Sequence, residues 1–325
     1  MNDPGIGLSD NKQSADDARS KSVKVLEKFE EIANQLKEKY AKAKPYSHCC
    51  IDGLFPKSLL QGVIGEVPKP ESNQDWIPFE QEGRAHNKVI SSVEGLNHAG
   101  EQTKQLLSIL TSSRFIRSLE TLSGIRGLML DPHFYNSGFH QMSRGGFLKI
   151  HRDFFYHHEL SIYRRVNIIL YLNEDWKEEY GGYLELCDED LENSVMYYPF
   201  NNRLVISNVT ADALHGNPAP LACPEDRTRI SFALWYFTSQ MPREELLRYE
   251  LASNSGWYDK NSLTKEVKEP LIWTIIPPVV RDFFFRPLAV IIKFTPPIIV
   301  HALSLMRRWR TLAELKRRQA VRPGH

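Results

Sequence analysis

Three side chains that lie far apart in the sequence could together bind one metal ion. His151 and Asp153 are separated by one residue and close a strand-like segment, and residues two apart on a strand project from the same face. His215 follows much later in the chain. Two imidazoles and one carboxylate on one side of an ion form the facial triad of non-haem Fe(II), with positions left open for other ligands. We therefore predict an iron site at these three residues.

An arginine near the end of this region could hold an anion beside such a metal. Arg229 opens the apolar segment RISFALWYF (229–237). A guanidinium binds a carboxylate through two parallel hydrogen bonds, and an arginine entering an apolar strand needs an anionic partner. An oxygenase that uses a dicarboxylate co-substrate needs such a residue, and Arg229 is the candidate for this role. Arg227 is a second candidate, because it lies two residues earlier.

The elements that position these residues have the pattern of antiparallel strands. Several short segments are rich in Val, Ile, Leu, Tyr and Phe, with Gly, Asn, Asp and Pro between them. They are GFLKIH (146–151), RVNIILYLN (165–173), GGYLELC (181–187), NRLVISN (202–208) and RISFALWYF (229–237). The absence of long helices between them argues against a parallel β-α-β sheet and favours a sandwich or jelly roll.

Residues 128–240 resemble the prolyl 4-hydroxylase-like branch of the Fe(II)/2-oxoglutarate-dependent dioxygenase superfamily. The matching motifs are GGFLKIHRDF, RRVNIILYLNEDW, YGGYLEL, PFNNRLVISN, LHG and RTRISFALWYF. The resemblance implies an α+β fold with a double-stranded β-helix (jelly-roll) core, flanking N-terminal helices and a helical C-terminal extension. It also implies Fe(II), 2-oxoglutarate as co-substrate and O2, with ascorbate as the reductant.

The resemblance assigns further residues to the co-substrate. Tyr171 matches the family tyrosine that helps to hold the distal carboxylate, and Ser231 matches a position that adds a hydrogen bond there. Gln141 stands where several prolyl hydroxylases carry a tyrosine that contacts the co-substrate. This departure weakens the expectation of a prolyl substrate.

Three residues are candidates for the substrate pocket. Arg165 and Asn167 precede Tyr171 on the same expected strand and share its face by the period of two. His157 lies in an expected loop just after the His-x-Asp pair.

The chain divides into four expected parts. Residues 1–21 are polar and expected to be disordered, and residues 22–44 form an amphipathic helix that ends at Pro45. The apolar stripe of this helix covers the main domain or forms a homodimer contact. Residues 45–242 are the dioxygenase domain, in which the helix over 101–122 is expected to break near Ser112. Residues 243–325 form an apolar and then basic helical extension.

Composition limits the partners and the compartment. Lys and Arg (41) nearly balance Asp and Glu (40), so no nucleic-acid partner is expected. The four cysteines contain no CxxC pair, which fits reduced thiols in a cytoplasmic protein. Residues 270–306 are apolar, but charges and prolines interrupt them before the roughly 20 residues that span a bilayer. Short helices packed on the core or peripheral membrane contact remain as alternatives.

The expected function is hydroxylation of an unidentified substrate, with release of succinate and CO2. Peptidyl proline, another protein side chain and a small metabolite all fit. The alternative from another class is a non-catalytic metal-binding jelly roll, a cupin-like sensor or binding protein. A zinc hydrolase is disfavoured because the chain has no HExxH motif.

Overall fold

The computed structural model describes residues 8–68, 75–91, 96, 99–251, 257–258 and 265–266. Its helices are α1 (Leu8–Ala41), α2 (Lys57–Gly65), α4 (Glu101–Leu110), α5 (Ser113–Ser123), α6 (Arg243–Leu251) and the 3-10 turn η1 (Glu178–Tyr180). The strands before residue 160 are β1 (His48–Asp52), β2 (Trp76–Pro78), β3 (Ala85–Ser91), β4 (Met129–Leu130), β5 (Gly138–His151) and β6 (Tyr156–His157). The later strands are β7 (Ile162–Tyr171), β8 (Leu184–Cys187), β9 (Ser194–Tyr197), β10 (Arg203–Asn208), β11 (Leu214–Asn217), β12 (Arg229–Thr238), β13 (Trp257–Tyr258) and β14 (Lys265–Glu266).

Strand β5 connects two antiparallel layers. Its first half pairs with β12, and the first layer continues through β7 and β10 to β1. Its second half pairs with β11, and the second layer continues through β8 to β9. Between the halves, Gly145 has a φ of +76°, and a Cβ on Gly146 would lie 2.4 Å from Met142 Cγ and 2.7 Å from Ser143 O. Glycine is required here because the strand bends from one layer into the other.

The two layers face each other and form a jelly roll. Tyr171 and Val205 of the first layer pack against Leu184 and Leu186 of the second. The strand order and the antiparallel pairing are those of a double-stranded β-helix, so the predicted fold class is confirmed.

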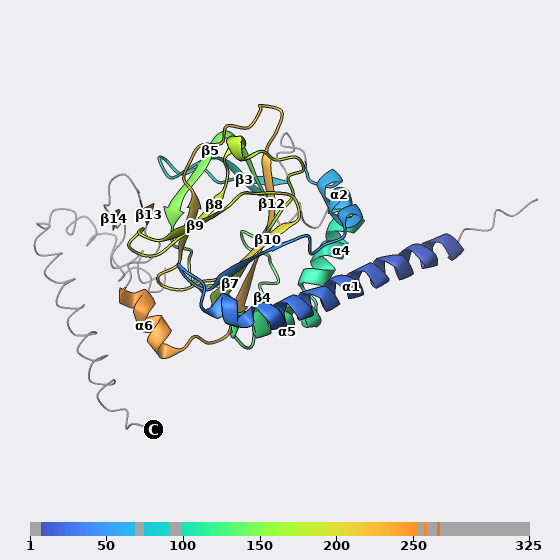
Figure 1. Ribbon diagram of the computed structural model, residues 1–325, viewed down its shortest axis with the longest axis horizontal. Coiled ribbons are helices and arrows are strands. Elements are labelled where there is room, and N and C mark those ends of the chain that lie inside the picture. The colour runs from blue at the N-terminus through green and yellow to red at the C-terminus, as the bar shows by residue number, and fades with distance from the viewer. Residues whose placement is uncertain are drawn as a thin grey trace, which may run out of the picture. The chain divides into compact units, whose positions relative to one another are not determined.

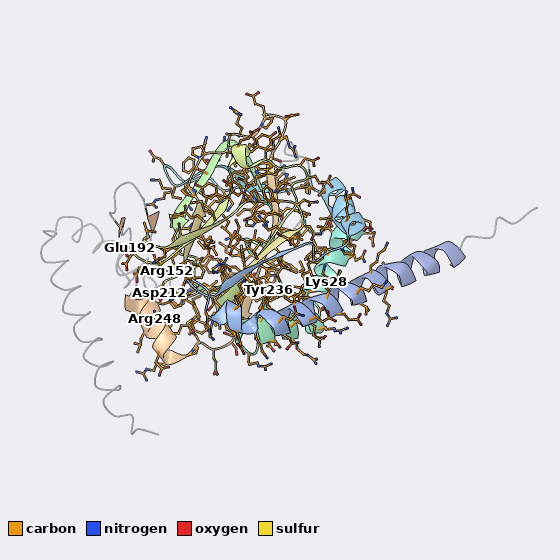
Figure 2. The ribbon with its side chains drawn as sticks, viewed as in Figure 1. Lys28, Arg152, Glu192, Asp212, Tyr236 and Arg248 are labelled. Carbon is orange, nitrogen blue, oxygen red and sulfur yellow. The ribbon has the colours of Figure 1, made fainter. Side chains whose placement is uncertain are left out.

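Helices cover the outer face of the first layer (Figure 1). The apolar stripe of α1 is buried against this layer and α5, with Phe29 stacked on Phe115 at 4.3 Å between ring centroids. Tyr236 of β12 lies within this core, and its hydroxyl donates to the Leu110 carbonyl of α4 at 2.8 Å (Figure 2). The predicted stripe is therefore used within the chain, where it holds the sheet from behind.

The predicted elements differ from the observed ones mainly at the flanks. Helix α1 begins at Leu8, so the expectation of disorder over 1–21 is wrong for residues 8–21. Once a helix is nucleated, each further residue adds a hydrogen bond at little cost, and acidic residues near the N-terminus favour it. The break near Ser112 is confirmed, because the Ser112 hydroxyl accepts from Phe115 N and caps α5. Strands β1 and β3 were not predicted.

The chain separates into two compact units, and the second comprises residues 241–256 and 265–325. Its described part is mainly α6. The predictions for the apolar and basic tail lie outside the described residues. No helix in the described part of the chain has the length and apolar character needed to span a membrane.

Candidate metal and co-substrate site

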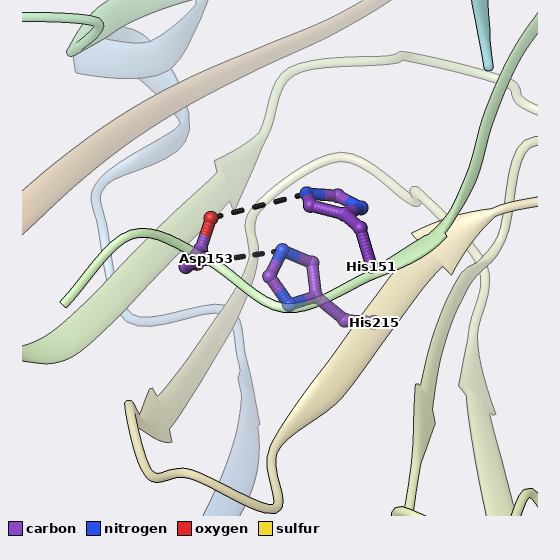
Figure 3. Close-up of side chains that lie close together, drawn as sticks. All are labelled: His151, Asp153 and His215. Carbon is purple, nitrogen blue, oxygen red and sulfur yellow. Dashed lines mark ion pairs between the residues drawn. The ribbon is translucent and has the colours of Figure 1, made fainter. Parts of the chain in front are cut away.

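The three predicted metal ligands converge in the interior of the jelly roll. His151 of β5 and His215 of β11 are paired across the two strands, so their rings lie side by side, 4.6 Å apart between centroids. Asp153 follows in the loop after β5, two residues beyond the last residue of the strand. Its carboxylate oxygens lie 3.9 Å from His151 Nε2 and 3.6 Å from His215 Nε2 (Figure 3). One donor atom from each residue lies within 4.8 Å of the others, which is close enough to bind one ion.

The buried surroundings of these three residues keep them in the protonation states in which they can bind a metal. Burial and then the neighbouring His215 lower the pKa of His151 to about 3, and burial also lowers the pKa of His215. His151 Nδ1 lies 2.9 Å from the Lys149 carbonyl, which only accepts, so Nδ1 carries the proton and Nε2 has the lone pair that can bind a metal. Burial alone would raise the pKa of Asp153, but Arg164 and both histidines outweigh burial and lower it. The site therefore offers two neutral imidazoles and a carboxylate.

A buried arginine and an asparagine fix the orientation of this carboxylate. Arg164 Nη2 and Asn167 Nδ2 lie 2.9 Å and 2.8 Å from Asp153 Oδ2, and Arg164 Nε donates to Asn167 Oδ1 at 2.8 Å. The guanidinium also lies over the Trp235 ring, 3.8 Å from its centroid. Both donors contact Oδ2, which also lies 3.6 Å from His215 Nε2, whereas Oδ1 lies on the side of His151.

Replacing Arg164 with leucine should weaken both the fold and the metal site. In the metal-free protein Asp153 would become a buried unpaired charge, which costs about 3–5 kcal/mol of unfolding free energy. Metal affinity should fall roughly 10- to 100-fold, because the ligand loses its support. Urea unfolding and Mn(II) titration measure the two effects. Arg117→Leu, at an exposed position of α5, is the matched control and should change neither.

A second cation, Arg229, is buried in the same interior. It is 5% exposed, and its Nε and Nη2 donate to the Gly182 carbonyl at 2.7 Å and to the Tyr171 hydroxyl at 3.1 Å. A Cβ on Gly182 would lie 2.9 Å from Arg229 Cδ, so the double glycine allows this close approach. Among the described residues, no carboxylate lies within ion-pairing distance of Arg229. A buried guanidinium without a counter-ion fits an anionic ligand.

Ser231 and Tyr171 lie beside this arginine as predicted. Ser231 is paired with Tyr171 of β7 on one side and with His140 of β5 on the other. Alternation along β12 places Arg229 and Ser231 on one face, so the structure brings the three predicted anchors together.

Gln141 lies elsewhere, and its predicted contact with the co-substrate is corrected. It is paired with Ile230 of β12 and Val89 of β3, and both of these side chains pack against the core under the helices. Its amide donates to Thr228 Oγ1 at 2.7 Å. Because alternate residues face opposite sides of a sheet, Gln141 points away from Arg229.

Arg227, the second candidate anchor, lies before β12 and donates to the Glu174 carbonyl. Arg227 is therefore engaged away from Tyr171, whereas Arg229 contacts the Tyr171 hydroxyl. Arg229 remains the candidate anchor.

A β-bulge corrects the prediction for Arg165. Tyr236 pairs with Val166, whereas the next residue, Phe237, pairs with Arg164, so Arg165 is an extra residue in β7. The bulge reverses the alternation, and Arg164 instead of Arg165 shares the face of Asn167. The period of two placed Asn167 correctly, because no bulge lies between it and Tyr171.

His157 is buried on β6 and does not lie in the expected loop. Its Nε2 is 3.5 Å from Asp131 Oδ2, and its ring lies 5.7 Å from Tyr135 and 6.0 Å from Phe237 between centroids. Trp235 and Phe237 lie on the same face of β12 and form an aromatic wall of the site. His157 lies behind this wall, against Phe237.

Sequence reasoning missed three basic residues of the interior, namely Lys88, His140 and Arg164. Burial, followed by the charge of Lys88, lowers the pKa of His140 well below its usual value. Its Nε2 lies 3.1 Å from the Asn136 carbonyl. His140 precedes Met142 by two residues, so both side chains lie on the same face of β5. The sequence alone could not show that this face points into the site, because that depends on which strands pair with β5.

The metal-free protein should therefore lose stability as pH falls below about 6.5. In that range the unfolded chain binds a proton at His140 and the folded chain does not, so the unfolding free energy decreases on acidification. His140→Gln should reduce the slope by up to about 1.4 kcal/mol per pH unit. Urea unfolding at pH 5, 6 and 7 tests this, and equal slopes in both proteins would contradict it.

Together, these features define a jelly-roll protein whose interior contains three convergent residues that could hold one metal ion and, nearby, a buried arginine. Residues 137–237, which include all three donors and Arg229, match the family model of the 2OG-Fe(II) oxygenase superfamily. This segment therefore has the sequence pattern of the 2-oxoglutarate-dependent oxygenase superfamily and is a domain of that type.

Several solved structures are similar to the chain at low sequence identity. A prolyl hydroxylase from Trichoplax adhaerens, in complex with a hypoxia-inducible factor peptide, is 18% identical over 70% of this chain and 96% of its own, with a TM-score of 0.49. A Pseudomonas putida prolyl-4-hydroxylase is 17% identical over 64% and 99%, with a TM-score of 0.44. HygX from Streptomyces hygroscopicus, with nickel and 2-oxoglutarate bound, is 11% identical over 59% and 83%, with a TM-score of 0.42. No curated protein matches the chain.

Proposed function

We propose that His151, Asp153 and His215 bind Fe(II) and that Arg229, with Tyr171 and Ser231, binds the distal carboxylate of 2-oxoglutarate. The observation that carries this proposal is the buried Arg229 guanidinium, which has no carboxylate partner among the described residues and shares the interior with three convergent metal donors.

Strand β7 sets the separation between the two parts of the site. Tyr171 hydrogen-bonds Arg229, and Asn167, four residues earlier on the same face, hydrogen-bonds Asp153. Four residues of strand span about 13 Å, and the side chains shorten the gap between the guanidinium and the metal donors. This geometry suits a short diacid that reaches both.

When bound, Fe(II) and 2-oxoglutarate supply the activation of O2 that hydroxylates a C–H bond, with release of succinate and CO2. The chain contributes position and exclusion of water. Arg164 and Asn167 keep Asp153 ionised and oriented, His151 keeps its Nε2 lone pair towards the ion, and Arg229 with Tyr171 holds the co-substrate. Ascorbate as reductant belongs to the same proposal.

The substrate remains at the level of class. A prolyl 4-hydroxylase-like activity is supported by the sequence motifs, and it is weakened by Gln141, which points away from the site. A non-catalytic cupin-like protein is less well supported, since a metal module without a co-substrate has no need of Arg229.

The test is binding followed by turnover. Under argon with Mn(II), calorimetry should show 2-oxoglutarate binding at one site. With Fe(II), O2 and ascorbate, the protein should form succinate slowly even without a primary substrate, and omission of ascorbate should shorten the active period. Mn(II) binding without 2-oxoglutarate binding would reject the oxygenase proposal and favour the cupin-like alternative.

A further inference from the structure

The interior of the site contains more positive charge than the proposed reaction requires. Three cationic side chains, Lys88, Arg164 and Arg229, share it with a single carboxylate, Asp153, among the described residues. Arg164 is paired with Asp153, and Arg229 is the proposed binding group for the carboxylate of 2-oxoglutarate. Lys88 has no role in either arrangement.

Lys88 lies on the same face as Arg229, one strand further along the sheet. It is paired with Met142 of β5, and Met142 is paired on its other side with Arg229 of β12. Residues directly opposite each other in an antiparallel sheet project from the same face, so Lys88 and Arg229 flank Met142. The Lys88 ammonium lies over the Phe79 ring, 4.7 Å from its centroid.

A bulge in β3 produces this orientation. The pairing of β3 with β5 shifts between His86 and Lys88, and Asn87 between them has a φ of +51° and donates to the Arg144 carbonyl at 2.8 Å. Strand β3 thus follows the bend of β5. The local backbone is fixed by pairing on both sides of the bulge, so Lys88 is held in the interior by the fold.

The electrostatic surroundings of Lys88 leave its charge unbalanced. No carboxylate of the described residues forms an ion pair with it. Burial, followed by the repulsion of Arg229, lowers the pKa of Lys88 to about 8, although Asp153 acts in the opposite direction. The ammonium is still mostly protonated at pH 7. The Lys88 side chain is partly exposed, and a cation in such a position is stabilised when an anion binds beside it.

We propose that Lys88 forms a subsite for an anionic group, a carboxylate or phosphate, of the primary substrate. This inference rests on the proposed function, in which one carboxylate of 2-oxoglutarate is bound by Arg229 and the other by the metal. After both have bound, the charges of Fe(II), Asp153, Arg164 and Arg229 and of the diacid leave one positive charge, and Lys88 adds a second. The primary substrate is the remaining ligand that can supply negative charge, so the site selects acidic substrates.

Inorganic phosphate serves as the probe, with substoichiometric Mn(II) and saturating 2-oxoglutarate on the full chain. Phosphorus relaxation enhancement by the bound Mn(II) reports phosphate that enters the site. In Lys88→Met the apparent phosphate affinity should fall about tenfold or more. Lys88→Arg should retain it, and so should the matched control Lys104→Met, whose side chain is exposed on α4 and pairs with Glu101.

A parallel calorimetric titration separates the two sources of anion. The dissociation constant of 2-oxoglutarate should change less than about twofold in Lys88→Met, whereas Arg229→Met should weaken it strongly. Equal phosphate titrations in the wild type and Lys88→Met overturn the inference. Loss of 2-oxoglutarate affinity in Lys88→Met as large as in Arg229→Met also overturns it, by assigning Lys88 to the co-substrate.

The same experiments distinguish failure of the proposed function. If wild-type protein binds Mn(II) but not 2-oxoglutarate, the oxygenase proposal fails, and the phosphate titration is repeated with Mn(II) alone. Phosphate binding that depends on Lys88 would then still support the anion subsite, and binding that is independent of Lys88 would reject it. Thermal unfolding should show Lys88→Met to be at least as stable as the wild type, because the repulsion between Lys88 and Arg229 is removed.

Discussion

His215→Ala should abolish succinate formation and reduce Fe(II) or Mn(II) affinity by more than about 100-fold. Loss of a residue that merely supports a metal ligand costs roughly 10- to 100-fold, and loss of one of three protein ligands should exceed that. Metal titration and succinate formation in the presence of Fe(II), O2 and 2-oxoglutarate measure the two effects.

The fold should survive this substitution, because removing a neutral imidazole leaves no buried charge unpaired. Asp153→Ala differs in this respect, since it strands the buried Arg164 guanidinium and should lower the unfolding free energy by about 3–5 kcal/mol. His158→Ala, at an exposed position, is the matched control and should leave metal binding intact. Undiminished metal affinity in His215→Ala would reject the proposed triad.

Arg229→Met should raise the dissociation constant of 2-oxoglutarate by about 100-fold while metal binding is retained. Removing one partner of a buried, hydrogen-bonded charge pair costs about 2–5 kcal/mol, and each 1.4 kcal/mol corresponds to tenfold in affinity. Calorimetry under argon with Mn(II) measures both ligands in the same sample.

Two variants define the specificity of that result. Tyr171→Phe removes one hydrogen bond to Arg229 and should weaken 2-oxoglutarate by up to about tenfold. Arg227→Met should have little effect, because its guanidinium is bound to the Glu174 carbonyl. If Arg227→Met matched Arg229→Met, the assignment of the anchor would have to be exchanged.

The convergence of the triad could be predicted because strong local patterns surround each ligand. The His-x-Asp spacing follows a β-branched and aromatic segment, and Arg229 opens another. Strands of this kind are recognisable from composition and alternation alone. Arg229, Tyr171 and Ser231 were grouped correctly because each lies in a part of its strand that is free of irregularities.

The errors arose where pairing between strands overrides the period of two. A bulge at Arg165 brings Arg164 to Asp153, and a bulge in β3 turns Lys88 inward. Gln141 was assigned by its distance from His151 along the chain, which ignores the bend between them. Bulges depend on the register of partner strands, and no single sequence segment reports that register.

The flanks were harder to predict for a different reason. The early part of α1 lacks an apolar stripe, so its helicity follows from extension of a helix that is stabilised further along by Phe29 and its neighbours. Strand β11 is four residues long and contains Gly216 and Asn217, which are weak strand formers. It forms because it fills the gap between β5 and β8.

The bend of β5 helps to fix the distance between the Arg229 guanidinium and the three metal donors. Met142, before the bend, is registered against Arg229, and His151, after it, is registered against His215. The span between the Arg229 guanidinium and the three metal donors therefore depends on the angle at Gly145 and Gly146 as well as on strand β7. If 2-oxoglutarate binds as proposed, we expect it to bind more tightly than a diacid that is one methylene shorter or longer, because the backbone of the sheet fixes the distance between its two binding groups.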